Sequence, residues 1–431
     1  MNEATITFVR QHADDDVRQL ALRMKQGDDV DLKAALQQIQ GRQTARRKLP
    51  TWAACDDILY PPHLSMEQCS SEQTARYKAA VAEKLIASTE TSASTPPTET
   101  TLIDLTGGFG VDFSFLAPLF TKAVYVERQE TLCRLARHNL QALGLHHAEV
   151  VCADSEDYLE AVKANSESRF FFLDPARRNE QGGRTYGLSD CTPDVLALRD
   201  ELLQKADYVM LKLSPMLDWR KTVEDLGRNH VAQVHIVATG NEVKELLVVM
   251  QPITETLNVT CINDNNPFTV EIKAIDAIAP ISSKAAMPTK APIPSKAPIT
   301  SKAAMPSISS FLYEPNAAIM KGGFFAELSA RYGVSQIAQN SHLFVSEQRV
   351  EGFPGREFRI KAVTTMNKKE LKQALQGIAQ ANIAVRNFPL SVAELRKRLK
   401  MSEGGSTYIF ATTLANGEHV LFICEKMRNE E

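Results

Sequence analysis

Residues 101–112 read Thr-Leu-Ile-Asp-Leu-Thr-Gly-Gly-Phe-Gly-Val-Asp, an apolar strand that runs directly into a glycine-dense turn. Gly107, Gly108 and Gly110 allow the backbone to adopt positive φ and to approach a ligand more closely than a Cβ would permit. Asp104 stands at the end of the strand, so its carboxylate would point into the crevice at the carboxyl edge of a parallel sheet. Open α/β folds bind their ligands there, and the segment therefore predicts a small-ligand site.

Two kinds of nucleotide ligand compete for such a turn. The dinucleotide pattern G-x-G-x-x-G requires a third small residue, which residues 108–113 (Gly-Phe-Gly-Val-Asp-Phe) do not supply. Asp112, at the expected start of the next helix, would repel a diphosphate but suits an ammonium or sulfonium group. S-adenosylmethionine carries both cations and is the predicted ligand. The alternative is a plain strand-to-helix turn without a ligand.

Three further predicted strands end in an acidic residue, at Glu127, Asp154 and Asp174. Glu127 follows the glycines by about 20 residues, the separation at which an acid can reach a pair of ribose hydroxyls. Asp154 is placed to accept a hydrogen bond from an adenine amine. Because the carboxyl ends of parallel strands meet at one edge of a sheet, we expect the four carboxylates to converge.

These motifs resemble those of the class I S-adenosylmethionine-dependent methyltransferases, which share a Rossmann-like, seven-stranded, doubly wound α/β sheet. The resemblance implies that Asp104 with the glycine turn forms the first motif, Glu127 the second and Asp154 the third. Residues 208–215 would then be the fifth strand, and residues 231–239 and 244–250 the sixth and an antiparallel seventh. The long C-terminal extension is similar to that of bacterial methyltransferases with a THUMP-like domain.

The fourth motif of the resemblance is Asp174-Pro175-Ala176-Arg177, which would face the methyl acceptor. Asp174 would hold or deprotonate the acceptor, and Pro175 would fix the loop and expose its carbonyl. Methyltransferases of exocyclic base amines place an aromatic residue where this chain has Arg177. A related RNA motif needs a nucleophilic cysteine, for which Cys191 is the nearby candidate. Arg177 and Arg178 would clamp a phosphate, or else form solvent-exposed salt bridges.

Composition predicts a soluble cytoplasmic protein without a membrane segment. The seven cysteines are odd in number and show no disulfide framework, which favours a reducing compartment. The N-terminus lacks a signal peptide, and no run approaches 18 apolar residues. No metal is expected, because the histidines at 138, 146 and 147 lack the spacing of a zinc site. A net charge of −3 does not by itself indicate nucleic-acid binding.

Residues 1–86 are expected to form an N-terminal helical region. Helices are predicted at residues 17–24 and 32–39, followed by a basic strip made of Arg42, Arg46, Arg47 and Lys48, which suits either RNA contact or a solvated helix end. Ser70 or Ser71 would cap a further helix that runs toward Leu85, with a loop from residue 88 to residue 100. In the class I methyltransferases that this chain resembles, the corresponding helix often closes over the donor. The resemblance therefore makes Gln73 and Lys78 candidate cofactor contacts.

Residues 100–278 are the expected methyltransferase domain, and residues 279–310 are a Lys/Pro/Ala-rich linker that cannot bury a core. Residues 311–431 should form a small α+β domain, with strands at 358–366, 381–388, 407–414 and 419–425 and helices at 368–379 and 391–401. This region contains 16 Lys and Arg against 12 Asp and Glu. Arg396 and Arg398 concentrate that charge on one helix and are the predicted RNA contacts, although a plain solvated face is the alternative.

These features predict a cytoplasmic S-adenosylmethionine-dependent methyltransferase that modifies RNA, at a base of tRNA or rRNA. Two alternatives stay open: a non-catalytic protein that binds the donor and RNA, and a methyltransferase with a small-molecule acceptor. The four acids favour the enzyme, since a site without catalysis would have no reason to retain Asp174-Pro175 at the end of a strand.

Overall fold

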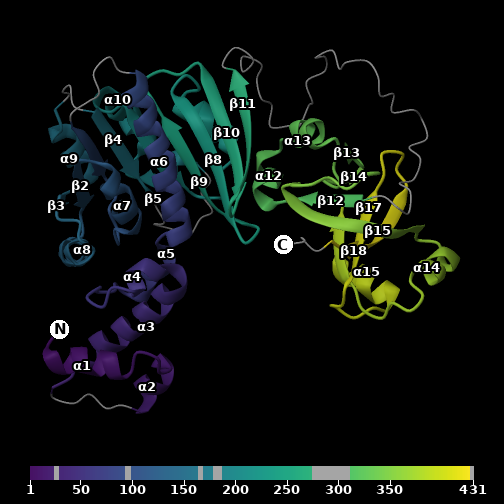
Figure 1. Cartoon of the computed structure of the whole chain (residues 1–431), viewed down its shortest axis with the longest axis horizontal. Helices are drawn as coiled ribbons and strands as arrows, with labels where there is room; N and C mark the ends of the chain where they lie inside the picture. Colours follow the sequence, from purple (N-terminus) through teal and green to yellow (C-terminus); the bar gives the residue numbers. More distant parts are fainter. Residues whose placement is uncertain (24–28, 93–98, 164–167, 178–186, 274–310, 428–431) are drawn as a thin grey trace. The chain divides into compact units, whose positions relative to one another are not determined.

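The computed structural model describes residues 1–23, 29–92, 99–163, 168–177, 187–273 and 311–427. The chain divides into two compact units (Figure 1). The first comprises Met1–Gln233 and Leu246–Glu255, and the second comprises Val234–Glu245 and Thr256–Glu431. The predicted linker at residues 279–310 lies outside the described residues.

A sheet with the strand order β11-β10-β8-β9-β7-β4-β1-β2-β3 dominates the fold. Its strands are β1 (Thr100–Asp104), β2 (Lys122–Glu127), β3 (Ala148–Cys152), β4 (Ser168–Leu173), β7 (Tyr208–Leu213), β8 (Val231–Thr239), β9 (Glu242–Met250), β10 (Thr256–Asn263) and β11 (Asn266–Lys273). The first five pair in parallel, and β9 runs antiparallel to β7. The predicted Rossmann-like α/β class and the antiparallel last strand are confirmed.

The predicted count of seven strands is wrong, because the sheet has nine. The β10–β11 hairpin pairs beside β8, so it supplies hydrogen-bond partners to a strand that would otherwise be an open edge. Asp264 lies in the turn between the two strands and has a φ of 53°. The alternating run of β-branched and apolar residues in Thr256–Asn263, followed by Asn and Asp, is a signal from which the hairpin could have been predicted.

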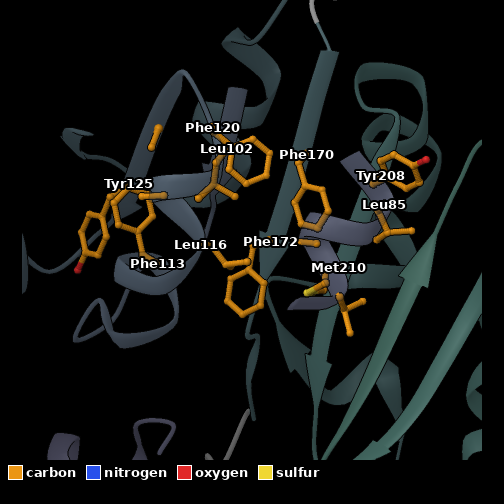
Figure 2. Close-up of a cluster of buried hydrophobic side chains, with 14 of the residues drawn as sticks. Leu85, Leu102, Phe113, Leu116, Phe120, Tyr125, Phe170, Phe172, Tyr208 and Met210 are labelled. Carbon is orange, nitrogen blue, oxygen red and sulfur yellow. The ribbon is translucent and has the colours of Figure 1, made fainter. Parts of the chain in front are cut away.

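The main core packs aromatic and aliphatic side chains of the strands against those of the neighbouring helices (Figure 2). Phe170 and Phe172 of β4 are buried with Met210 of β7, and β4 is covered on both faces as expected for a central parallel strand. Helices α7 (Val111–Leu116), α8 (Glu130–Ala142), α9 (Ser155–Ala161), α10 (Val195–Lys205) and α11 (Trp219–Leu226) connect the strands. The carboxyl ends of the strands are thereby held on a rigid frame.

The described residues before the sheet form six helices: α1 (Glu3–Gln11), α2 (Val17–Arg23), α3 (Leu32–Lys48), α4 (Pro50–Ala53), α5 (His63–Gln68) and α6 (Glu72–Ser92). The two predicted helices are present as α2 and α3, and α3 continues through the basic strip. Ser71 caps α6 by accepting from the Thr74 amide at 3.3 Å. The predicted start of the following loop at Ser88 is wrong, because α6 continues to Ser92. The Ser88 hydroxyl donates to the Leu85 carbonyl within the helix.

A second sheet, with the order β13-β14-β12-β15-β18-β17-β16, forms the C-terminal α+β domain. Its elements are β12 (Phe311–Pro315), α12 (Ala317–Gly322), α13 (Phe325–Tyr332), β13 (Ser335–Gln336), β14 (Phe344–Ser346), β15 (Gly355–Thr365), α14 (Lys368–Ala374), β16 (Asn382–Arg386), α15 (Val392–Leu399), β17 (Thr407–Thr413) and β18 (His419–Lys426). The six elements predicted from residue 358 onward are all present. In the same unit, Arg331 stacks over the Phe268 ring of β11 at 4.3 Å.

Candidate active site

The glycine turn between β1 and α7 has the geometry that its sequence predicts. Gly108 and Gly110 have φ values of 56° and 85°, and Gly110 begins α7 in the left-handed conformation. A Cβ on Gly107 would lie 2.2 Å from the ring of Tyr125. Each glycine is therefore required, the first by lack of space and the other two by backbone conformation.

Glu127 binds the glycine turn directly. Its carboxylate accepts from the Gly108 amide at 3.0 Å and from the Gln129 amide at 2.8 Å, and the side chain is buried. The Tyr125 hydroxyl donates to the Gly108 carbonyl from the same strand. The second acid of the predicted set therefore lies beside the turn. Its contact with a ribose stays a prediction.

Asp104 is 1% exposed at the end of β1 and accepts from the Thr106 amide at 2.9 Å. Burial raises the pKa of Asp104 well above its usual range, and the negative charges of Asp112, Asp174 and Glu127 raise it further. Thr106 also connects two strand ends, because its Oγ1 accepts from the Asp174 amide at 2.6 Å. The carboxyl ends of β1 and β4 are thus joined through one threonine.

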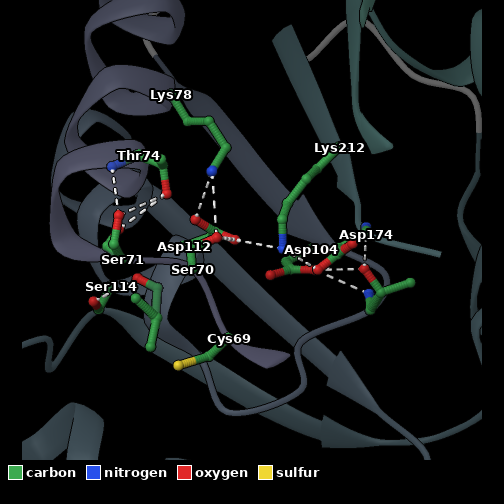
Figure 3. A network of polar contacts seen from close by, with 12 residues as sticks. Cys69, Ser70, Ser71, Thr74, Lys78, Asp104, Asp112, Ser114, Asp174 and Lys212 are labelled. Atoms are coloured by element: carbon green, nitrogen blue, oxygen red, sulfur yellow. Dashed lines mark hydrogen bonds and ion pairs between the residues drawn. The ribbon is translucent and has the colours of Figure 1, made fainter. Parts of the chain in front are cut away.

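Asp174 is paired with a lysine that the sequence reasoning did not assign (Figure 3). Lys212 Nζ, from β7, lies 2.5 Å from Asp174 Oδ2 and 3.8 Å from Asp112 Oδ2. The Asp174 side chain is 40% exposed and that of Lys212 is 13% exposed. Pro175 is buried. A lysine within an apolar strand predicted to be buried was the signal in the sequence that could have identified Lys212.

A second ion pair supports the start of α7. Lys78 of α6 is fully buried, and its Nζ lies 3.2 Å from Asp112 Oδ1. The Ser70 hydroxyl donates to Asp112 Oδ2 at 2.7 Å. Burial alone would raise the pKa of Asp112, but the charges of Lys78 and Lys212 outweigh it and lower that pKa. Lys78, a candidate donor contact, instead lies inside the protein against Asp112.

The remaining predicted residues lie at separate places. Asp154 is exposed and caps α9 by accepting from the Glu156 amide at 3.0 Å, and Gln73 is exposed on α6. The backbone of Arg177 in β5 (Ala176–Arg177) pairs with Cys191 in β6 (Cys191–Thr192), and the Cys191 side chain is buried. Arg178 lies outside the described residues. Arg396 and Arg398 lie on α15 of the second unit.

The described residues contain neither a metal site nor a membrane-spanning helix. Among them, no group of three or more His, Cys, Asp or Glu side chains is arranged to hold a metal ion. In the same part of the chain, no helix is both long enough and apolar enough to cross a membrane.

Family models, a relative and a solved structure match this chain. A THUMP domain-like family model matches residues 355–426, and a ferredoxin-like domain model matches residues 311–354. The chain is 22% identical over 331 residues to an uncharacterized S-adenosylmethionine-dependent methyltransferase of Mycobacterium tuberculosis, covering 75% of this chain and 81% of the relative. It is 31% identical to a proposed methyltransferase of Porphyromonas gingivalis W83, whose crystal structure matches with a TM-score of 0.77 over 99% of this chain and 98% of that one.

The site fits the methyl donor of this family on its own chemistry. The positive-φ turn at Gly108 and Gly110 leaves the backbone open to close approach, and the carboxylates of Asp104 and Glu127 lie beside it. Such an acidic, glycine-lined edge matches a ligand that carries an ammonium and a sulfonium. The chain therefore belongs to the S-adenosylmethionine-dependent methyltransferases that carry a C-terminal THUMP-like domain.

Proposed function

We propose that this methyltransferase acts on RNA, with tRNA or rRNA as the acceptor. The support is the pairing of a donor site with a THUMP-like domain, since the resemblance implies that such domains bind RNA in tRNA-modifying enzymes. The charge of α15 agrees with that role, because Lys397, Arg398 and Lys400 are exposed at its C-terminal end. Lysine and arginine side chains there would contact phosphates.

The two predicted RNA contacts on α15 differ in how strongly they are bound to their own domain. Arg396 donates to the Ala381 carbonyl at 3.1 Å and lies 3.9 Å from the Glu403 carboxylate. Arg398 is exposed on the same turn. We therefore assign the larger share of phosphate binding to Arg398. Arg396 would hold the helix against β16 and contribute less.

In the first unit, the donor would be held by Asp104, Glu127, Asp154 and the glycine turn, with Gln73 at its methionine end. The donor supplies an activated methyl group, so the protein has chiefly to position the reactants. The observation that carries the catalytic assignment is the placement of Asp174, which Thr106 and Lys212 hold at the carboxyl edge beside Asp104. A carboxylate held there is suited to accept a proton from the methyl acceptor.

A labelled methyl donor and total RNA test this proposal. The wild-type protein should incorporate label into RNA, and Asp174→Ala should abolish incorporation while calorimetry still detects donor binding. Asp157→Ala, at an exposed aspartate of α9, is the matched control and should behave as wild type. Incorporation by Asp174→Ala equal to that of the control would refute the catalytic assignment, and absence of label from RNA with the wild type would refute the substrate.

A further inference from the structure

Lys212 is the cation in contact with Asp174, and the donor site described above gives it no role. It stands in β7 among Met210, Leu211 and Leu213, all of which are buried. Its Nζ lies 2.5 Å from Asp174 Oδ2 at the edge of the sheet (Figure 3). Removing an ammonium group from water is costly unless a partner compensates it, so its place in an apolar strand calls for an explanation.

Neutralising Asp112 explains only part of the role of Lys212. The nearer cation to Asp112 is Lys78, at 3.2 Å against 3.8 Å for Lys212. The Ser70 hydroxyl donates a further hydrogen bond to Asp112 at 2.7 Å. Asp112 therefore has a counter-ion from α6, and of the two carboxylates Lys212 lies closer to Asp174. Asp174 and Lys212 therefore form an ion pair at the carboxyl edge of the sheet.

We propose that the acceptor atom is a hydroxyl oxygen, the ribose 2′-hydroxyl of RNA, and that Asp174 and Lys212 act on it together. This proposal rests on the proposed RNA function and departs from the base that the sequence led us to expect. A lysine ammonium has only donors, so it cannot accept the N–H of an exocyclic amine, and it repels the positive charge that develops on an attacking nitrogen. The same ammonium stabilises the negative charge that develops on a hydroxyl oxygen as its proton leaves.

The proposed step is a single displacement. The acceptor oxygen forms a bond to the methyl carbon as the carbon–sulfur bond breaks, and the electron pair of that bond stays on sulfur, which becomes a neutral thioether. The hydroxyl proton passes to the carboxylate of Asp174, whose 40% exposed side chain can release it to solvent. Lys212 keeps its proton and its charge throughout.

The residues of the fourth motif also favour a methyl acceptor that is not a base. Ala176 and Arg177 follow Asp174-Pro175, where a base-modifying site would place an aromatic ring for stacking. A ribose hydroxyl needs no stacking partner. The 2′-hydroxyl is also the group by which a protein distinguishes RNA from DNA.

The first test identifies the methylated atom. RNA from a strain that lacks the protein would be incubated with the full-length chain and labelled donor, digested to nucleosides and analysed by mass spectrometry. The expected product is a nucleoside methylated on its ribose. Label on a base would overturn this inference and leave the proposed function intact, whereas absence of label from RNA would overturn both.

The second test measures binding in place of turnover. Lys212→Met should raise the affinity for S-adenosylmethionine relative to its neutral product S-adenosylhomocysteine by about threefold or more, the effect of one unit charge at about 6 Å in water. Asp174→Asn should change the same ratio in the opposite direction. Lys221→Met, at an exposed lysine of α11, is the control and should leave the ratio unchanged.

A lysine with a purely structural role would move both affinities together, so an unchanged ratio in Lys212→Met and Asp174→Asn would overturn the assignment. For turnover, Lys212→Met should lower kcat by about 100-fold or more, as for other groups that stabilise a developing oxyanion. Lys212→Arg keeps the charge and should recover part of that loss. Equal kcat in the Met and Arg variants would contradict the proposed electrostatic role.

Discussion

Lys78 and Asp112 form a buried ion pair, with 3.2 Å between Lys78 Nζ and Asp112 Oδ1 and no exposure of the lysine. The pair joins α6 of the N-terminal region to the first turn of α7, which follows the glycine turn. The helices that precede the sheet are therefore connected electrostatically to the donor site.

Removing one partner of this pair should be strongly destabilising. Lys78→Met leaves the buried carboxylate of Asp112 with a weaker counter-ion, and we expect a loss of about 3–5 kcal/mol in the free energy of unfolding. The double variant Lys78→Met with Asp112→Asn removes both charges and should recover most of that loss. Denaturant titration measures both, and Lys84→Met, at an exposed lysine of the same helix, is the control. Strictly additive losses in the double variant would contradict the pairing.

Gly107→Ala should be more disruptive than an alanine at a glycine with open surroundings. The added Cβ would lie 2.2 Å from the Tyr125 ring, and overpacking of this kind costs about 1–3 kcal/mol on top of any effect on donor binding. Gly144 has a φ of 77° and nothing within 4 Å of a Cβ, so Gly144→Ala should show only backbone strain of about 1–2 kcal/mol and normal donor affinity. Calorimetry with the donor separates the two variants. Equal donor affinities would show that the turn tolerates displacement.

The raised pKa of Asp104 predicts how stability depends on pH. Burial makes the folded protein bind this proton more tightly than the unfolded chain does, so the contribution of Asp104 is most favourable at low pH. It is lost as the pH rises from about 4, the ordinary value, through the folded pKa. Asp104→Asn removes this titration. The decline in the free energy of unfolding between the ordinary and the folded pKa of Asp104 should therefore become flatter.

The Asp104→Asn comparison needs a control that titrates normally in both states. Asp157→Asn, at an exposed position, should leave the pH dependence of wild type unchanged. If Asp104→Asn and wild type lose stability in parallel as the pH rises, Asp104 does not carry the raised pKa. Donor titration of Asp104→Asn, measured in parallel, should show weaker binding because a carboxylate beside the glycine turn has been replaced by an amide.

Arg398→Glu should weaken RNA binding and reduce its salt dependence. Loss of one phosphate contact lowers the slope of log K against log salt concentration by about 1. Lys122→Glu changes the net charge equally at an exposed residue at the amino end of β2, away from the carboxyl edge, and should have the smaller effect. Binding isotherms at several salt concentrations would check this. Identical slopes for the two variants would remove α15 from the RNA-binding surface.

Much of the methyltransferase sheet could be predicted because its signals are local. Four of the five parallel strands are short apolar runs with an acid at or just beyond the end. Because the carboxyl ends of parallel strands share one edge, the sequence alone predicts that Asp104, Glu127, Asp154 and Asp174 lie along it. The strands of the β10–β11 hairpin alternate polar and apolar residues, a pattern that indicates strands but not the strand beside which they pair. Only pairing beside β8 shows that they extend the sheet.

The position of the donor site could be predicted from local sequence patterns. The turn conformation at Gly108 and Gly110 and the acids that end the strands are set by residues near them along the chain. The ion pairs could not be predicted in this way. Lys78 lies on α6, Asp112 on α7, Lys212 on β7 and Asp174 just after β4, so they meet only after the sheet and helices have packed. A lysine in a buried strand indicates a functional or paired side chain, but the sequence does not say which carboxylate it meets. Burial and a carboxylate within ion-pair distance are properties of the folded chain, and they give Lys212 its chemical role.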